Sequence, residues 1–432
     1  MTKVAKQNLK DKLAYDETFS CVQCGYCLPA CPTYQTMGKE SHSPRGRINL
    51  VKLAAEGKIP LSRLEEPIDL CLGCRACEPA CPTNVQYGKI LESAKVVLFE
   101  EKKEERKGVS ARAEDFLFNH IFPYPSRLNK IGSSMFFYQL TGMKKALHAT
   151  KLINVLPERL SKFDKITPKP AGPFQRRREH HLLPKNQPVL KVGFFPGCIM
   201  DTVFRDINNM SMKLLQAAGC EVEIVDQQTC CGALHSHRGD RQTAKELAKQ
   251  NIEAFEREDF AYIVNSIGGC GAMLSEYHHL FEDDMEWYER AKAFASKTKD
   301  ISYVLSQLEL PFKKDVQLTV TYQPSCHMTN VQKLTDEPLA LLKSIPGITF
   351  IPMEKPNKCC GSAGIYNLVH YDESMDILDE KMKDVNQVSV DGIVTTNPGC
   401  HLQMKLGVER EGKSDQIKVY HLVELLGEAC GL

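Results

Sequence analysis

The sequence has 432 residues, enough for two or three domains, and is 42% hydrophobic and 25% charged, like an ordinary globular protein. Its 55 basic and 54 acidic side chains give a net charge of +1, which excludes a globally basic nucleic-acid-binding protein. Residues 1–10 lack the apolar stretch of an export signal, and no apolar run has the length of a membrane span. We therefore expect the eighteen cysteines in a reducing cytoplasm, where clustered cysteines indicate metal or redox chemistry.

Two cysteine runs of identical spacing stand 50 residues apart near the N-terminus. Each has the pattern C-x2-C-x2-C-x3-C-P, which is typical of loops that wrap [4Fe–4S] clusters. Three cysteines of a run hold one cluster, and the fourth ligates the other cluster. Zinc favours paired C-x2-C knuckles instead, and disulfides require an exported protein. The pattern predicts one cluster at Cys21, Cys24, Cys27 and Cys81, and a second at Cys71, Cys74, Cys77 and Cys31.

Helices are predicted around these runs. Residues 1–20 are expected to form a helix that leads into the first run, and residues 87–107 one that follows the second. Between the runs, apolar residues at helical spacing and a proline in the first turn predict a helix over 44–55. Arg45 and Arg47 stand at its start, where they either face a cluster and tune its potential or are simply solvated.

The next region is a predicted connector. Residues 109–160 are apolar and aromatic, and their prolines predict short helices that either pack on the cluster domain or form a docking face for a partner. Residues 164–190 are rich in proline and are predicted to be a linker. Their basic run, Arg176–Arg178, has no basic domain around it, so we expect no nucleic-acid role.

The second half is an internal repeat. Predicted strands at 189–198 and 316–326 each end at a cysteine, a Cys-Cys-Gly triplet follows, and second strands at 261–270 and 392–400 end at another cysteine. Such a repeat predicts two similar α/β units with cysteines gathered where strands end. The two sets are Cys198, Cys230, Cys231 and Cys270, and Cys326, Cys359, Cys360 and Cys400.

These sets are candidate thiolate sites, because adjacent cysteines are poor disulfide partners and the following glycine lets the backbone approach a ligand. An iron–sulfur cluster of unusual shape, zinc, a metal-free redox disulfide and packed core thiols all remain open. Cys220 and Cys430 match no pattern and are predicted to be core thiols. A final helix is predicted over 419–429.

The predicted fold is thus mostly helical (α+β) in an N-terminal ferredoxin-like domain with two [4Fe–4S] clusters, and α/β in the repeats. We place the cluster domain at 1–108, the helical connector and linker at 109–188, and the Cys-Cys-Gly domains at 189–312 and 313–432.

This order of motifs resembles the iron–sulfur subunits of glycolate oxidase over about residues 10 to 430. The strings that carry the resemblance are CGYC and CPTY in the first run, SPRGRI at 43–48, SIGGCGA at 266–272 and CCGSAGIY at 359–366. The chain is also similar to an iron–sulfur component of anaerobic glycerol-3-phosphate dehydrogenase, to lactate-utilisation proteins and to heterodisulfide reductase subunits. In that wider family a further cysteine can follow each domain's last one, where this chain has Met273 and Gln403.

The resemblance implies an electron-transfer subunit whose partner is an FAD-containing subunit that oxidises a 2-hydroxy acid. It also implies a quinone or other acceptor, and a cytoplasmic location or one at the inner face of the membrane. The residues agree on this division of labour, since no G-x-G-x-x-G follows a strand and no nucleophile motif is present. The alternatives are a lactate or glycerol-3-phosphate dehydrogenase subunit, and a thiol–disulfide or quinone-reducing enzyme. The sequence predicts no catalytic residue for the substrate.

Overall fold

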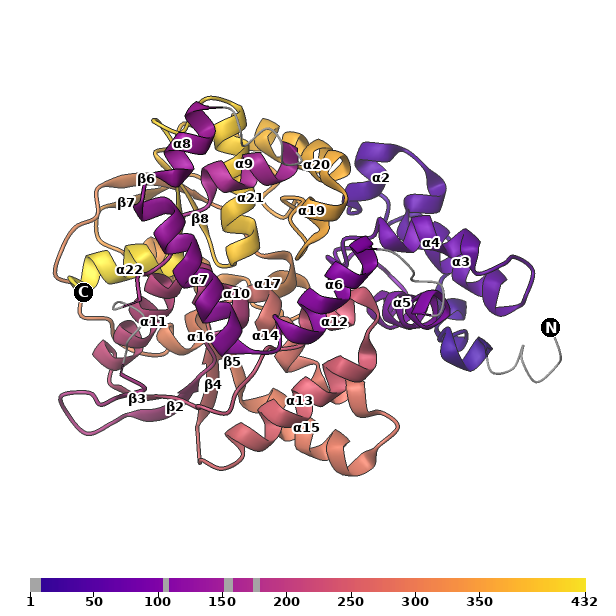
Figure 1. Cartoon of the computed structure of the whole chain (residues 1–432), viewed down its shortest axis with the longest axis horizontal. Helices are drawn as coiled ribbons and strands as arrows, with labels where there is room; N and C mark the ends of the chain where they lie inside the picture. Colours follow the sequence, from indigo (N-terminus) through magenta and orange to yellow (C-terminus); the bar gives the residue numbers. More distant parts are fainter. Residues whose placement is uncertain (1–8, 104–108, 151–157, 174–178) are drawn as a thin grey trace. The chain divides into compact units, whose positions relative to one another are not determined.

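A computed structural model describes residues 9–103, 109–150, 158–173 and 179–432 (Figure 1). The chain folds into two compact units that do not follow chain order. The first comprises residues 1–115, 233–244 and 358–381, and the second comprises 116–232, 245–357 and 382–432. The domain boundaries that we expect from the sequence remain predictions.

The first unit holds both cysteine runs among short helices. Helix α3 confirms the prediction for 44–55, because Pro44 occupies its first turn and the Ser43 hydroxyl accepts a hydrogen bond from the backbone N–H of Gly46. The buried core of this unit includes Ile48, Val51 and Ile90. Its N-terminal helices are η1 (Asp16–Ser20), α2 (Pro32–Met37), η2 (Glu40–His42), α3 (Pro44–Ala55), α4 (Ser62–Asp69) and α5 (Tyr87–Lys103).

Two helix predictions for this unit need adjustment. The continuous helix expected over 1–20 is wrong, because turn residues at 13–15 separate a short helical stretch at 9–12 from η1. Ala14 has a φ of 47°, which a helix cannot accommodate. The helix predicted for 87–107 is found as α5, and residues 104–108 lie outside the described part.

Each Cys-Cys-Gly triplet is followed by a short segment that belongs to the first unit. These segments contain α12 (Ala233–Arg238), and α19 (Tyr366–Val369) with α20 (Tyr371–Val385), which continues into the second unit. Helix α12 packs on α5, and a Cβ at Gly239 would stand 2.3 Å from the carbonyl oxygen of Lys95. Only glycine permits this approach, since Gly239 also has a φ of +94°.

The second unit contains two sheets of matching topology. One has the order β1-β3-β2-β4-β5 and the other β7-β6-β8-β9, and all neighbours run parallel except β1 and β3. The predicted internal repeat therefore pairs β3-β2-β4-β5 with β7-β6-β8-β9. The strands are β1 (His181–Leu182), β2 (Leu190–Phe194), β3 (Cys220–Ile224), β4 (Tyr262–Asn265), β5 (Thr298–Asp300), β6 (Leu318–Tyr322), β7 (Ile348–Phe350), β8 (Gly392–Thr395) and β9 (Lys418–His421).

The helices that follow the central strands begin at or near cysteines, as the repeat predicts. In chain order the helices of the two repeats are α10 (Cys198–Val203), α11 (Arg205–Ala217), α13 (Arg241–Phe255), α14 (Gly268–Ser275), η4 (Tyr277–Phe281), α15 (Met285–Lys297), α16 (Ile301–Leu305), α17 (Cys326–Asn330), α18 (Asp336–Ser344), α21 (Pro398–Arg410) and α22 (Leu422–Cys430). The helix predicted over 419–429 is wrong at its start, because residues 418–421 pair with β8 as strand β9 before α22 begins. Cys220 and Cys430 are fully buried core thiols, as predicted.

The two repeats meet through the starts of these helices. A Cβ at Gly268 of α14 would stand 2.2 Å from the Ser325 hydroxyl, beside α17. The Asn397 side chain accepts a hydrogen bond from the Gly269 N–H at 3.2 Å, and the Gln332 side chain donates one to the Gly268 carbonyl. The elements of the two repeats that carry cysteines therefore share an interface.

The connector forms short helices, as predicted: α6 (Val109–His120), α7 (Pro125–Leu140), α8 (Met143–Ala149) and α9 (Glu158–Ile166). Helix α7 packs on α10 of the first repeat, and α9 packs on α21 of the second. The basic run Arg176–Arg178 lies outside the described residues. Nowhere in the described part is there a helix with the length and apolar character of a membrane span.

A buried carboxyl in the first repeat gives a pH-dependent prediction. Asp300 is 2% exposed and caps α16, accepting hydrogen bonds from the backbone N–H and hydroxyl of Ser302. Burial raises its pKa from 3.8 to about 6, although these hydrogen bonds oppose the shift. The folded state therefore holds this proton to higher pH than the unfolded state, so the free energy of unfolding falls as the pH rises through this range.

Asp300→Asn, which cannot ionise, is expected to stabilise the chain at neutral pH. The gain should be on the order of 2 kcal/mol at pH 8 and smaller by about 1 kcal/mol at pH 5, as measured by chemical denaturation at the two values. A gain independent of pH would contradict the assigned cause. Ser302→Ala, which removes one hydrogen bond from the carboxylate, should instead destabilise the chain at pH 8.

Candidate iron–sulfur centres

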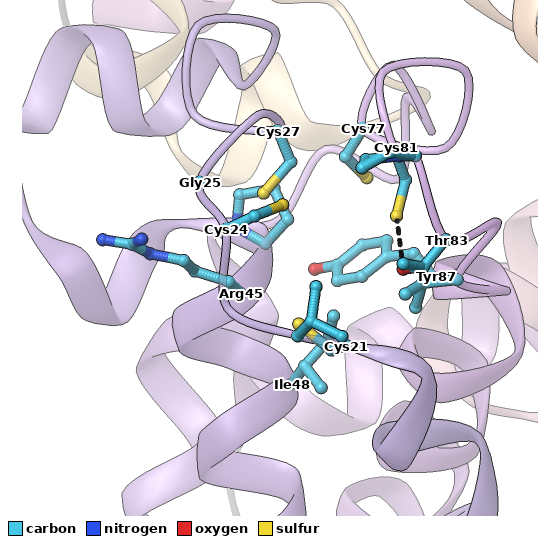
Figure 2. Close-up of a pocket in the computed structure, with 14 residues that line it drawn as sticks. Cys21, Cys24, Gly25, Cys27, Arg45, Ile48, Cys77, Cys81, Thr83 and Tyr87 are labelled. Carbon is cyan, nitrogen blue, oxygen red and sulfur yellow. Dashed lines mark hydrogen bonds between the residues drawn. The ribbon is translucent and has the colours of Figure 1, made fainter.

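Four cysteines from both runs surround one cavity in the first unit (Figure 2). The loop of the first run contributes Cys21, Cys24 and Cys27, and Cys81 of the second run faces them. Val22, Ile48 and Val85 supply apolar walls, and Arg45 also lines the cavity. The structure thus brings together the four sulfurs that the sequence assigns to the first cluster.

A second cavity is lined by the other four cysteines of the runs, which are Cys31, Cys71, Cys74 and Cys77. Leu72 and Arg47 also line it, and Tyr87 and Cys77 border both cavities. Every member of the second predicted set is therefore present, including Cys31 from the opposite run. The ligand assignment itself stays a prediction.

The two loops share an unusual backbone. The residues two positions after Cys21 and Cys71, Gln23 and Gly73, have φ values of 58° and 63°. The residues after Cys24 and Cys74, Gly25 and Arg75, have φ values of 88° and 56°. Left-handed conformations therefore recur at equivalent positions of the two loops, between the first and the third cysteine of each run. At each of these positions one loop has glycine and the other tolerates a side chain.

Two threonines contact the crossing cysteines. The Thr33 hydroxyl lies 3.2 Å from the Cys31 sulfur, and the Thr83 hydroxyl lies 3.4 Å from the Cys81 sulfur, the contact dashed in Figure 2. Each hydroxyl donates its hydrogen bond to a backbone carbonyl, that of Thr33 to His42 at 2.8 Å and that of Thr83 to Ser20 at 2.7 Å, so the threonines border the sulfurs through their oxygen atoms. The sequence reasoning missed both residues, although the repeated string Cys-Pro-Thr was a visible signal.

The electrostatic environments of the two cavities differ. Arg47 is 1% exposed and donates hydrogen bonds to the Pro67 carbonyl at 2.6 Å and to the Thr33 hydroxyl at 3.1 Å. Neither of these partners carries a charge, so its cation acts on the sulfurs of the second cavity. Arg45, at the first cavity, is ion-paired with Glu40 at 2.7 Å and bonds the Gln23 carbonyl. The predicted pair therefore divides into one buried cation and one compensated surface cation.

The buried charge of Arg47 affects the pKa of the Cys71 thiol. Burial alone would raise its pKa, but Arg47, Lys95 and a hydrogen bond with Tyr87 together lower the pKa of this thiol. The Tyr87 oxygen lies 3.4 Å from the Cys71 sulfur. Burial raises the pKa of Tyr87 well above its ordinary value, so its phenol stays protonated and can donate a hydrogen bond to the Cys71 sulfur. The second cavity therefore favours negative charge on the Cys71 sulfur, whereas burial raises the pKa of Cys77 well above its ordinary value.

The first Cys-Cys-Gly set is assembled in the second unit. The Cys230 and Cys198 sulfurs lie 3.5 Å apart, and the Cys231 and Cys270 sulfurs lie 3.3 Å apart. The contact with Cys230 and burial raise the pKa of Cys198 well above its ordinary value. The four groups therefore stay thiols at neutral pH unless a bound cation displaces their protons.

Two buried polar residues hold this triplet. The Asn251 side chain donates to the Cys230 carbonyl at 3.0 Å and accepts from the Thr229 N–H at 2.8 Å. The Tyr277 hydroxyl donates to the Cys231 carbonyl at 2.9 Å. Both residues were missed from the sequence, since they come from α13 and η4, far along the chain, and match no motif.

The second set falls in two units. Cys326 begins α17 and Cys400 lies in the first turn of α21, both in the second unit. Cys359 and Cys360 belong to the first unit, where Cys359 and Cys74 pack on one apolar cluster of Leu72, Tyr366 and Ile377. The triplet of the second repeat is thus adjacent to the second cysteine run, a relation that no motif indicated.

Comparisons with known proteins match the order of domains along the sequence. A model of the 4Fe-4S dicluster domain matches residues 17–85, and a model of the linker region of glycolate oxidase iron-sulfur subunits matches 111–167. A model of the cysteine-rich CCG domain matches 192–275 and 320–405. A probable glycolate oxidase iron-sulfur subunit of Bacillus subtilis (strain 168) is 46% identical over 435 residues, covering 99% of this chain and 98% of that protein. The chain belongs to the family of glycolate oxidase iron–sulfur subunits.

Other proteins match this chain at lower sequence identity. Lactate utilization protein A of Oceanobacillus iheyensis is 35% identical over 243 residues, 55% of this chain and 96% of that protein. The same-named protein of Geobacillus sp. (strain WCH70) is 33% identical over 239 residues, 55% of this chain and 99% of that protein. A crystal structure of a hypothetical protein from Helicobacter pylori has a TM-score of 0.41 and 9% identity over 79% of this chain and 77% of that one, which carries no functional argument.

The residues around the two cavities of the first unit fit iron–sulfur clusters. Each cavity offers four soft thiol donors and apolar walls, and its only charged lining groups are arginines. Among the residues that the structure describes, no three His, Cys, Asp or Glu side chains form a group suited to a single metal ion. This glycolate oxidase iron–sulfur subunit homologue therefore carries a dicluster domain followed by two cysteine-rich repeats.

Proposed function

We propose that this chain is the electron-transfer subunit of a glycolate dehydrogenase that lies in the cytoplasm or at the inner face of the cell membrane. An FAD-containing partner would oxidise the 2-hydroxy acid, and a quinone or another acceptor would take the electrons. Bound clusters would supply one-electron transfer, so that the two electrons of a reduced flavin on the partner could leave one at a time. The gathering of the eight cysteines of the two runs around two cavities, with Cys77 bordering both, supports this proposal most strongly.

The proposal assigns each cysteine of the two runs. Cys21, Cys24, Cys27 and Cys81 would hold one [4Fe–4S] cluster, and Cys71, Cys74, Cys77 and Cys31 the other. Cys198, Cys230, Cys231 and Cys270 would hold a further iron–sulfur cluster rather than zinc, since no described group of such side chains suits a single metal ion. A site at Cys326, Cys359, Cys360 and Cys400 stays a prediction, because these cysteines are divided between the two units. The buried charge of Arg47 would make the cluster in the second cavity the better electron acceptor of the two clusters.

A second substrate class has support. The 35% identity to a lactate utilization protein over 55% of the chain keeps lactate as an alternative 2-hydroxy acid. The substrate pocket would lie on the flavin subunit in either case, so this chain's residues do not select between the two acids.

Co-purification with a flavoprotein tests the proposal. The chain is co-expressed with the candidate FAD subunit, and reduction of the chromophores is followed after anaerobic addition of glycolate, lactate or glycerol 3-phosphate. We expect glycolate or lactate to bleach the iron–sulfur absorbance. Cys24→Ala should lose part of this bleaching, and Cys220→Ala, which replaces a buried thiol outside the predicted ligand sets, should keep it. Reduction of disulfides by the isolated chain would favour a thiol–disulfide enzyme instead.

A further inference from the structure

The connector carries a stretch of chain without acidic residues. Residues 116–157 hold five lysines and arginines and no aspartate or glutamate. The whole chain has 54 acidic residues in 432, so a segment of 42 residues would be expected to hold about five. The segment therefore has a net positive charge because acidic residues are missing from it, while its number of basic residues is ordinary for this chain.

The same segment exposes large apolar side chains. Among the described residues fifteen such side chains are exposed, and seven of them fall within 28 residues of this segment: Phe116, Leu117, Tyr124, Ile131, Phe137, Leu140 and Met143. Single exposed apolar residues are ordinary, but a contiguous group marks an interaction surface.

Helix α7 shows how charge and apolarity are combined. Six exposed residues recur at helical spacing and form one face, the α7 outer face, made of the N-cap residue Tyr124 and of Arg127, Lys130, Ile131, Ser134 and Phe137 within the helix. On the opposite side Leu128 and Gly132 are buried, and the Asn129 side chain accepts a hydrogen bond from Arg205. Arg127 uses its guanidinium on the His120 carbonyl and the Tyr124 ring rather than on a carboxylate.

We infer that the α7 outer face docks on a membrane surface that contains anionic lipids. Aromatic and aliphatic side chains enter the headgroup region while neighbouring Lys and Arg residues bind lipid phosphates. A hollow of about 530 Å³ adjoins this face, lined by Phe136, Phe137 and Leu140 of α7 and by residues 169–173 and Asp206. Its apolar wall suits an inserted acyl chain, and Lys169 suits the phosphate of the same lipid.

The position of α7 in the second unit gives this docking a consequence. Helix α7 packs directly on α10, whose first residue is Cys198 of the first Cys-Cys-Gly set (Figure 1). One helix diameter, about 10 Å, therefore separates the α7 outer face from the helix that begins at that site. Docking would bring the thiol site close to acceptors dissolved in the membrane. The inference deepens the proposed function and rests on it for this physiological meaning.

Vesicle flotation tests the inference. The full chain, loaded with its clusters, is mixed with vesicles of phosphatidylglycerol and phosphatidylcholine, or of phosphatidylcholine alone, at low and high salt. We expect binding to the anionic vesicles that weakens with salt. The double variant Arg127→Glu/Lys130→Glu should bind at least about tenfold more weakly, because each basic residue near such a surface contributes to the affinity. Phe137→Ser should also weaken binding, including the part that persists in high salt.

Matched variants keep the test specific. Lys313→Glu/Lys314→Glu makes the same charge change at exposed lysines outside the segment, and Met285→Ser removes another exposed apolar side chain, so both should bind like the original chain. Absence of binding to anionic vesicles, or equal losses in the matched variants, would overturn the inference. So would loss of the flavin subunit from Arg127→Glu/Lys130→Glu with vesicle binding intact, since the face would then dock a protein. Iron content and hydroxy-acid-dependent bleaching in these variants report separately on the proposed function.

Discussion

Replacing Arg47 with leucine is expected to lower the reduction potential of the cluster at Cys31, Cys71, Cys74 and Cys77 by roughly 100 mV. A unit charge about 6 Å away at an effective dielectric constant near 20 contributes about 3 kcal/mol, and about 2.3 kcal/mol corresponds to 100 mV for one electron. Arg47 is buried, and the Pro67 carbonyl and Thr33 hydroxyl that it contacts are neutral, so little compensates its charge. An anaerobic redox titration followed by electron paramagnetic resonance measures the shift.

Two further arginine variants separate charge from structure. Arg47→Lys keeps the charge but loses the forked hydrogen bonds, so its potential should stay near the original value. Arg45→Leu removes a cation that is already paired with Glu40 near solvent, and should shift the other cluster only slightly. Equal shifts in Arg47→Leu and Arg47→Lys would contradict the electrostatic cause. Both Arg47 variants should also destabilise the fold, by about 2 kcal/mol or more for leucine, because the Pro67 carbonyl loses its donor.

Removing a crossing cysteine is expected to abolish the cluster of the opposite run. Cys81→Ala should lose the cluster at Cys21, Cys24 and Cys27, and Cys31→Ala the one at Cys71, Cys74 and Cys77. In each case the iron of the dicluster domain should fall from about eight atoms to about four, or to about seven if a three-iron cluster persists. The reason is geometric, because three cysteines of one loop and the last cysteine of the other line each cavity, and Cys77 of the second loop borders the first cavity as well.

Arg47→Leu can identify which cluster survives. In a Cys81→Ala background the remaining cluster lies beside Arg47, so adding Arg47→Leu should still lower its potential. In a Cys31→Ala background the remaining cluster lies in the other cavity, and the same addition should have little effect. The reverse pattern would show that the fourth cysteine of each run ligates its own cluster.

Much of the fold was predictable because its signals are local. The cysteine spacing, the Ser-Pro start of α3 and the strands that end at cysteines each depend on residues near one another in the chain. The internal repeat was visible because both copies keep the same motif order, and the two sheets share one strand order. The strand β9 was taken for the start of a helix, since its four residues continue into the apolar pattern of α22.

The unpredicted features depend on distant contacts. Asn251 and Tyr277 hold the Cys230–Cys231 backbone from other elements, and only folding shows that their polar groups end there. The packing of Cys359 beside the second cysteine run joins positions that are almost 300 residues apart. The different roles of Arg45 and Arg47 follow from burial, because the two side chains are two residues apart and look alike in the sequence.

Iron and acid-labile sulfide analysis of anaerobically purified chain, with electron paramagnetic resonance of the reduced protein, tests the central claim most directly. Two clusters in the dicluster domain predict at least about eight irons and eight sulfides per chain and two magnetically interacting centres, and a higher iron count would come from the Cys-Cys-Gly sets. About four irons, or zinc without sulfide, would contradict the claim that these eight cysteines hold two [4Fe–4S] clusters.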